Sequence, residues 1–308
     1  MAVEPPDQPC ILRSNKRGGV RNLSLTSPLV AMPFRTIEIS NPEDTPHGVT
    51  FVTVKSAALR ARADLSLYVP QGEHPAPLPL VILLHGVYGS HWAWLFKGAA
   101  HRVLDQLMKD EGLPAMVLAM PSDGLWGDGS GYLRHARSDY ARWIVEEVPQ
   151  AAAAVAPGCE QAPRFLCGLS MGGYGALRLG ALHPEVFSAF SAHSPITDVT
   201  QMQGFVEETP EQFELAEQPP LAALECLLLN QSQLPPFRFD CGTDDALLPH
   251  SRHLHEALKK AQVPHEYAEF PGGHTWDYWH QHLADALRFF ARILTAGAPA
   301  PPPPPALG

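Results

Sequence analysis

The sequence predicts an α/β protein built on one mostly parallel, twisted β-sheet with helices on both faces. Three observations support this fold class. Short apolar runs alternate with amphipathic stretches of helical spacing, the first strands alternate apolar and polar residues, and the later strands are more continuously apolar. Strand–helix alternation favours parallel pairing, because each crossover helix packs back onto the sheet. With 308 residues, 45% of them hydrophobic, the chain is long enough for one such core.

The expected elements follow the chain in that order. Residues 49–54 and 63–68 alternate like an antiparallel pair with one solvated face. Further apolar runs predict strands at residues 80–84, 115–120, 165–169, 187–192, 237–241 and 266–270. Apolar residues at helical spacing predict helices at residues 99–108, 140–155, 176–182, 254–261 and 278–294.

The ends of the chain differ from its centre in composition. Residues 1–31 lack apolar periodicity and predict a disordered tail, and the Pro/Ala-rich residues 296–308 predict an extended one. We therefore expect a single α/β domain to span residues 32–295. Residues 200–235 have no clear period, which is typical of an insertion that caps an active site.

The charge balance limits the expected partners. With a formal net charge of −10 and a pI near 5.8, the protein repels phosphate backbones and anionic lipids. We therefore expect no nucleic acid and no membrane as partner. Basic residues precede the apolar run 23–32, but serine, threonine and proline interrupt it, so it is a poor export signal. We expect a cytoplasmic protein, with export as the alternative.

Neither the cysteines nor the histidines have the spacing of a metal site. The cysteines are odd in number and are interpreted as free thiols, which favours a reducing compartment: Cys10, Cys159, Cys167, Cys226 and Cys241. The clustered histidines lack a metal-binding pattern and are interpreted as solvated or helix-face residues: His250, His253, His255, His280 and His282. We expect no metal.

The strongest functional signal is the pentapeptide Gly168-Leu169-Ser170-Met171-Gly172, a G-x-S-x-G pattern between an expected strand and an expected helix. A serine hydroxyl is a weak nucleophile that needs exposure, a base and an oxyanion site. A sharp strand-to-helix turn, or nucleophile elbow, holds the serine above the sheet. Ser170 would then lie near the amino terminus of the following helix, where the Met171 N–H can donate to an oxyanion. We therefore predict Ser170 as the nucleophile and Met171 as part of an oxyanion hole.

A second motif follows the buried strand 80–84. The segment His85-Gly86-Val87-Tyr88 ends that strand, where a backbone N–H can face a substrate carbonyl. Val87 is the expected second oxyanion donor, and Tyr88 is its alternative. We interpret His85 as orienting this loop through hydrogen bonds.

The triad acid is expected at the end of strand 237–241. A carboxylate there can orient a histidine and stabilise its imidazolium form. Asp240 still lies within the strand pattern. Asp245 lies three residues after Gly242, the usual spacing in hydrolases, and we favour it over Asp244.

The base is expected after the last strand. His274 follows two glycines on a loop from which it can reach the serine. The chain order Ser170, Asp245, His274 is the serine–acid–histidine order of α/β hydrolases.

At these motifs the sequence resembles the putative-esterase family of α/β hydrolases. That family includes tributyrin-esterase-like carboxylesterases, S-formylglutathione hydrolases, feruloyl esterases and mycolyltransferases. The resemblance covers about residues 49–294, and it implies a Ser/Asp/His catalytic triad, no cofactor and hydrolysis of acyl esters. The matching segments are residues 84–86, 120–124, 168–177, 240–245 and 273–274.

Departures from that family narrow the expected function. S-formylglutathione hydrolases usually carry a histidine before the nucleophile and a cysteine in the oxyanion loop, where this sequence has Leu169 and Val87-Tyr88-Gly89. We therefore expect a serine carboxylesterase that hydrolyses small acyl esters through an acyl-enzyme. The alternatives are an acyltransferase, an S-formylglutathione hydrolase and a feruloyl or acetyl-xylan esterase. The complete set of triad residues argues against a non-catalytic binding protein.

Aromatic side chains beside these motifs either line the substrate pocket or pack in the core. As a working hypothesis, the pocket includes Tyr88, Trp126, Tyr174 and Trp276.

Overall fold

One mixed β-sheet forms the frame of the protein in the computed structural model, which describes residues 34–46, 48–209, 211–215 and 220–297. The nine strands lie in the order β1-β2-β3-β5-β4-β6-β7-β8-β9. The pairings β1·β2, β2·β3 and β3·β5 are antiparallel, and every other pairing is parallel. The predicted mostly parallel sheet is therefore confirmed. The strands are β1 (Ile37–Ile39), β2 (Val49–Lys55), β3 (Arg62–Tyr68), β4 (Leu80–Leu84), β5 (Val117–Pro121), β6 (Arg164–Leu169), β7 (Ala189–His193), β8 (Phe237–Gly242) and β9 (Glu266–Phe270).

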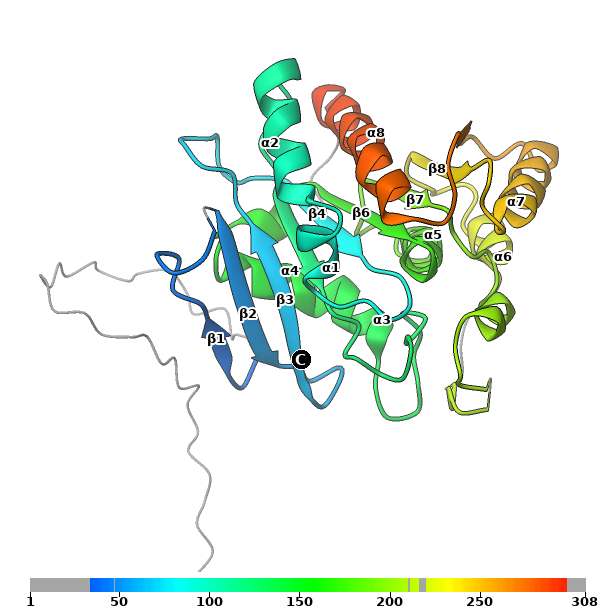
Figure 1. The fold of residues 1–308 in the computed structure, drawn as a ribbon, viewed down its shortest axis with the longest axis horizontal. Helices are drawn as coiled ribbons and strands as arrows, with labels where there is room; N and C mark the ends of the chain where they lie inside the picture. Colours follow the sequence, from blue (N-terminus) through cyan, green and yellow to red (C-terminus); the bar gives the residue numbers. More distant parts are fainter. Residues whose placement is uncertain (1–33, 47, 210, 216–219, 298–308) are drawn as a thin grey trace, which may run out of the picture.

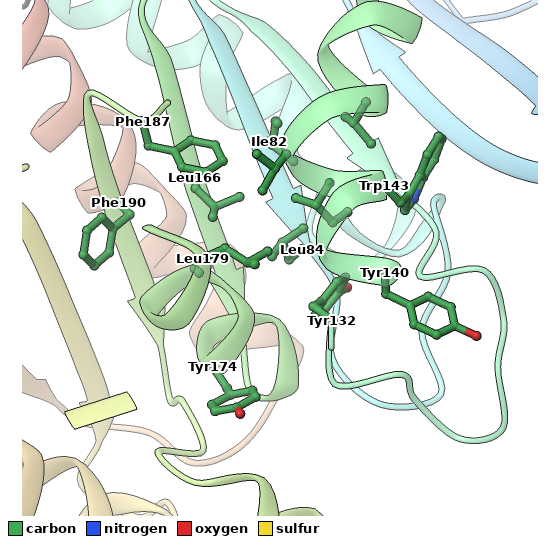
Figure 2. Close-up of a cluster of buried hydrophobic side chains, with 14 of the residues drawn as sticks. Ile82, Leu84, Tyr132, Tyr140, Trp143, Leu166, Tyr174, Leu179, Phe187 and Phe190 are labelled. Atoms are coloured by element: carbon green, nitrogen blue, oxygen red, sulfur yellow. The ribbon is translucent and has the colours of Figure 1, made fainter. Parts of the chain in front are cut away.

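Helices cover both faces of this sheet, and each face has its own apolar core. One core packs under α1, α2 and α8, which lie together on one side in Figure 1. The other packs under α3 to α7, and Figure 2 shows part of it around Ile82 and Leu166. The helices are α1 (Ala93–Phe96), α2 (Ala100–Glu111), α3 (Tyr140–Arg142), α4 (Val148–Ala153), α5 (Met171–Leu182), α6 (Ala223–Leu229), α7 (Leu248–Lys260) and α8 (Trp276–Thr295).

Three helices differ from the sequence prediction. The expected helix 140–155 is interrupted by a π-helical turn at Trp143–Glu147. Helix α5 begins at Met171 rather than at residue 176, because tight packing against β4 and β6 overrides the low helix propensity of its glycines. Helix α7 begins at Leu248 rather than at residue 254, with a proline in its first turn, where the missing N–H costs no hydrogen bond.

The expected insertion 200–235 has two structural parts. Helix α6 is part of the core on the α5 face, where Leu227 is fully buried. The earlier part contains a short 3₁₀ helix, Val199–Gly204, and the residues after it contact two loops: Phe205 stacks on His274, and Glu208 accepts the Asp128 N–H. Helix α6 therefore belongs to the α/β domain itself. That residues 199–215 cap the active site stays a proposal. The two predicted tails lie outside the described residues, apart from residues 296 and 297.

The cysteines of the described residues carry free thiols. They are buried, as expected for Cys167 and Cys241, and Cys10 lies outside the described residues. Within the described part of the chain, no helix combines the length and apolar character needed to cross a membrane.

Candidate active site

Ser170 occupies a sharp elbow between β6 and α5. Its backbone has φ 53° and ψ −118°, a strained conformation for a residue with a side chain. Its N–H donates to the His193 carbonyl at 3.0 Å, which ties the elbow to β7. The elbow requires glycine on both sides. A Cβ on Gly168 would lie 2.1 Å from the Gly172 carbonyl oxygen, and one on Gly172 would lie 2.3 Å from that of Leu84.

The structure brings the predicted nucleophile, base and acid together in one hydrogen-bond chain. Ser170 Oγ lies 3.0 Å from His274 Nε2, and His274 Nδ1 lies 2.8 Å from Asp245 Oδ2. Because a carboxylate accepts, the Nδ1–H of His274 donates to Asp245. Nε2 is then free to accept the Ser170 hydroxyl proton. This is the tautomer that a general base requires.

Asp245, rather than Asp244, faces the histidine. Asp245 is buried, and its second oxygen accepts the Leu247 N–H at 2.8 Å. Burial alone raises the pKa of Asp245, but the hydrogen bonds from His274 and Leu247 outweigh it and hold this pKa below its usual value. Asp244 is exposed, and its N–H donates to the Gly272 carbonyl at 2.9 Å. The acid loop and the histidine loop are thereby joined through their backbones.

Aromatic rings hold the His274 imidazole from two sides. Trp279 of α8 meets it edge-on, with ring centroids 4.9 Å apart. Phe205, from the expected cap, stacks against it at 6.0 Å. Sequence reasoning missed Phe205, because nothing in the irregular segment around it indicates which loop it contacts.

The loop after β4 lies against the serine. A Cβ on Gly86 would come 3.2 Å from Ser170 Cβ, so Gly86 permits this approach. His85 orients the loop as expected, since Nδ1–H donates to the Gly86 carbonyl at 2.7 Å and Nε2 accepts the Asp123 N–H at 3.1 Å. The His85 ring itself is buried.

Two backbone N–H groups beside Ser170 are available to a ligand. The N–H of Tyr88 donates to the Asp128 carbonyl at 2.8 Å, whereas that of Val87 has no acceptor among the described residues. This difference favours Val87 over Tyr88 as a donor to substrate. Met171 opens α5, and the first N–H groups of a helix have no partner within it. Both side chains border Gly129, where a Cβ would lie 2.5 Å from Met171 Sδ and 3.3 Å from Val87 Cγ1.

The four aromatic residues expected in the pocket occupy different places. Tyr88 is 68% exposed on the loop after β4. Trp126 is half-buried and packs edge-on against His135, at 4.6 Å between centroids. Trp276 is half-buried too, and its ring centroid lies 5.6 Å from that of Trp94.

Tyr174 requires a correction, because the structure places it in the core. Its side chain has no exposed surface, and its hydroxyl donates to the Leu221 carbonyl at 2.6 Å. Figure 2 shows it among the buried side chains on the α5 face of the sheet. Its hydroxyl is occupied in anchoring the segment before α6, so the residue is not in a position to line a substrate pocket.

The histidine clusters do not assemble into a candidate metal site. Among the described residues, no three His, Cys, Asp or Glu side chains form a group that could hold a metal ion. His255 and His265 hydrogen-bond to each other at 2.8 Å, and His282 bonds to Asp285 at 2.8 Å.

We expect Gly168→Ala to abolish most esterase activity and to destabilise the protein by about 1–3 kcal/mol, the usual range for overpacking. The new methyl group would overlap the Gly172 carbonyl and force the elbow apart. The matched control is Gly204→Ala, because a Cβ there meets no atom within 4 Å. Thermal melting and steady-state kinetics of both variants test this expectation. Equal activity of the two variants would contradict it.

The comparison with known families identifies the family of the chain. Residues 56–290 match the model of the family described as "Putative esterase". This match spans more than half of the chain, so the chain belongs to this esterase family. The protein is accordingly an enzyme of the carboxylic ester hydrolase class.

Individual relatives are similar to this chain at low sequence identity. An acetyl esterase from Caldicellulosiruptor saccharolyticus is 25% identical over 235 residues, which cover 70% of this chain and 84% of that protein. The structure of a ferulic acid esterase superposes with a TM-score of 0.69 at 24% identity, over 80% of this chain and 97% of the other. An S-formylglutathione hydrolase from Staphylococcus aureus superposes with a TM-score of 0.66 at 16% identity, over 82% and 99% of the two chains. These superpositions show a common fold.

Proposed function

We propose that the enzyme is a serine carboxylesterase that hydrolyses small acyl esters through a covalent acyl-enzyme. Ser170 is the nucleophile, His274 the general base and acid, and Asp245 the group that orients His274. The observation that carries this proposal is the continuous hydrogen-bond chain from Ser170 Oγ through His274 to the ionised Asp245. The strained elbow at Ser170 supports it as well.

In the acylation step, Ser170 Oγ attacks the ester carbonyl carbon while its proton passes to His274 Nε2. The N–H groups of Val87 and Met171 stabilise the oxyanion that forms on the carbonyl oxygen. Asp245 stabilises the imidazolium. The C–O bond to the alcohol then breaks, and the alcohol leaves with the proton from Nε2.

The deacylation step repeats this chemistry with water. His274 removes a proton from the water, whose oxygen attacks the acyl carbon of the Ser170 ester. A second tetrahedral intermediate collapses, the bond to Ser170 Oγ breaks, and the proton on Nε2 returns to that oxygen. The carboxylic acid leaves and the free enzyme is restored.

A panel of p-nitrophenyl acyl esters of rising chain length tests the proposed substrate class. Short acyl groups are expected to give the highest kcat/KM, since the 25%-identical relative is an acetyl esterase and Phe205 stands over the imidazole. Feruloyl esters and acetylated xylan belong in the same panel. A higher kcat/KM on either of these than on the short p-nitrophenyl esters would contradict the small-ester proposal. The substrate class would then be esters attached to plant polysaccharides.

The charge around Tyr88 disfavours anionic substrates. Asp128, Glu207 and Glu208 are close enough to Tyr88 to act on its charge, and hydrogen bonds join them: Glu208 accepts the Asp128 N–H at 3.1 Å, and Asp128 accepts the Glu207 N–H at 2.8 Å. Partial burial, and then these three negative charges, raise the pKa of the Tyr88 phenol. The same field repels substrate carboxylates. This argues against a glutathione thioester as the natural substrate.

We expect S-acetylglutathione to be hydrolysed with a kcat/KM about tenfold below that of an uncharged acetyl thioester of similar size, because like charges oppose its approach. Added salt should narrow the difference, since exposed charges are screened. The variant Glu207→Gln, which removes one of these negative charges, should reduce the difference in kcat/KM between the two thioesters at low salt. Equal kcat/KM values for the two thioesters at low ionic strength would contradict this specificity.

A further inference from the structure

A buried network of charged groups lies beneath the site, between the sheet and α8. Its centre is Asp240 of β8, which has no exposed surface. One carboxylate oxygen lies 2.9 Å from His193 Nδ1 and 3.0 Å from an Arg238 nitrogen. The other accepts the Tyr278 hydroxyl at 2.9 Å. One side chain thus connects β7, β8 and the first turn of α8.

The network carries charge in a dry environment. Burial alone lowers the pKa of His193, but the neighbouring Asp240 carboxylate outweighs burial, so this pKa is raised above its usual value. The pKa of Asp240 is lowered despite its burial, chiefly by His193 and then by Arg238. Hydrogen bonds between charged groups in such surroundings are short and directional, which makes the network a rigid junction.

One arm of the network holds the backbone of the nucleophile. The His193 carbonyl accepts the Ser170 N–H at 3.0 Å. The next residue, Ser194, donates its N–H to the Asp240 carbonyl at 2.7 Å. His193 and Asp240 are also register partners in the parallel pair β7·β8. The position of Ser170 therefore depends on how His193 is held against Asp240.

The other arm holds the loop of the base. The Tyr278 ring packs against Gly272, where a Cβ would lie 2.9 Å from Tyr278 Cδ2. Gly272 lies two residues before His274 on the same loop. Trp279, the neighbour of Tyr278 on α8, contacts the His274 imidazole edge-on. A shift of the first turn of α8 would therefore move His274.

We propose that Asp240, with its donors His193 and Tyr278, is a positioning residue that sets the separation of Ser170 Oγ and His274 Nε2. This inference rests on the proposed function of Ser170 and His274. None of the network side chains has a hydrogen bond to either of those two side chains among the described residues, so the network acts through the backbone at Ser170 and through the packing around His274.

The test is Tyr278→Phe, which removes one hydroxyl and keeps the ring against Gly272. A small misplacement of reacting groups lowers turnover strongly, so kcat on p-nitrophenyl acetate is expected to fall about 10- to 100-fold, with KM within about twofold of wild type. The rate constant of fluorophosphonate labelling should fall in parallel. Rates are divided by the fraction of protein that is finally labelled, so unfolded molecules do not count. Asp240→Asn, which weakens both arms, is expected to lower kcat by about 100-fold or more in the folded fraction.

The matched control is Tyr68→Phe. This substitution also removes a tyrosine hydroxyl that donates to a carboxylate, that of Asp105. The hydrogen bond that is lost, however, joins β3 to α2, away from Ser170 and His274. Its melting temperature is expected to fall while its kcat stays within about twofold of wild type. If Tyr278→Phe behaves like this control, the network only stabilises the fold and the inference fails. If Ser170→Ala, measured alongside, keeps full activity, the proposed function itself fails.

Discussion

Replacement of Ser170 by alanine should lower kcat on p-nitrophenyl acetate by about 10⁴- to 10⁶-fold, the loss typical of a missing triad nucleophile. The substitution removes the Oγ that lies 3.0 Å from His274 Nε2. It leaves the backbone hydrogen bond from residue 170 to the His193 carbonyl intact. The variant should therefore fold, with a circular dichroism spectrum and melting transition close to those of wild type.

A second serine variant makes this result specific. Ser138→Ala removes a hydroxyl that donates to the Leu59 carbonyl at 3.2 Å, outside the hydrogen-bond chain of the site. Its kcat should remain within about twofold of wild type. An activity of Ser170→Ala within about tenfold of wild type would mean that another residue attacks the ester, since loss of the nucleophile costs far more.

The second large effect is expected for Asp245→Asn, which should lower kcat by about 10⁴-fold at neutral pH. The amide keeps the size of the carboxylate, but its NH₂ group favours the histidine tautomer with a bare Nδ1. In that tautomer Nε2 carries the proton and cannot accept one from Ser170. The imidazolium that forms during attack also loses its countercharge.

Asp244→Asn is the matched control for this prediction. Asp244 is exposed, and its backbone N–H, which the substitution keeps, makes the bond to Gly272. Its kcat should stay within about threefold of wild type, because no charge next to His274 is removed. Steady-state kinetics and melting curves of both variants decide whether Asp245 or Asp244 is the acid that orients His274. A reversed ranking would assign the acid to Asp244, and two active variants would assign it to a different loop.

Local sequence signals predicted the fold well where burial leaves a simple pattern. The continuous apolar runs became β4, β5 and β6, which are buried along their whole length. The three-residue strand β1 was missed, because its length leaves no period to detect. The start of α5 was missed because Gly172 and Gly173 are poor helix formers. The need for glycine at position 172 comes from tertiary contacts, because a Cβ there would clash with the Leu84 and His85 carbonyls.

In the site, too, some residues could be predicted from their neighbours in the sequence, and others only from tertiary contacts. Ser170, Asp245 and His274 follow strand ends with recognisable neighbours, so the sequence could predict them, and the structure brings their side chains together. Tyr174 lies two residues after the serine pentapeptide, but its side chain is buried in the core, a direction that the local sequence does not encode. Asp240 was seen as a strand residue. Its hydrogen-bond donors come from β7, β8 and α8, and no local sequence pattern indicates that these three elements meet at Asp240.

The central claim is that Ser170 attacks the ester carbonyl, and covalent labelling tests it most directly. The wild-type enzyme is treated with a fluorophosphonate, digested and mapped by tandem mass spectrometry, with Ser170→Ala as the parallel sample. We expect one modified residue, Ser170, together with loss of esterase activity in proportion to labelling and no label in the variant. Full inactivation with the label on any other residue would contradict it.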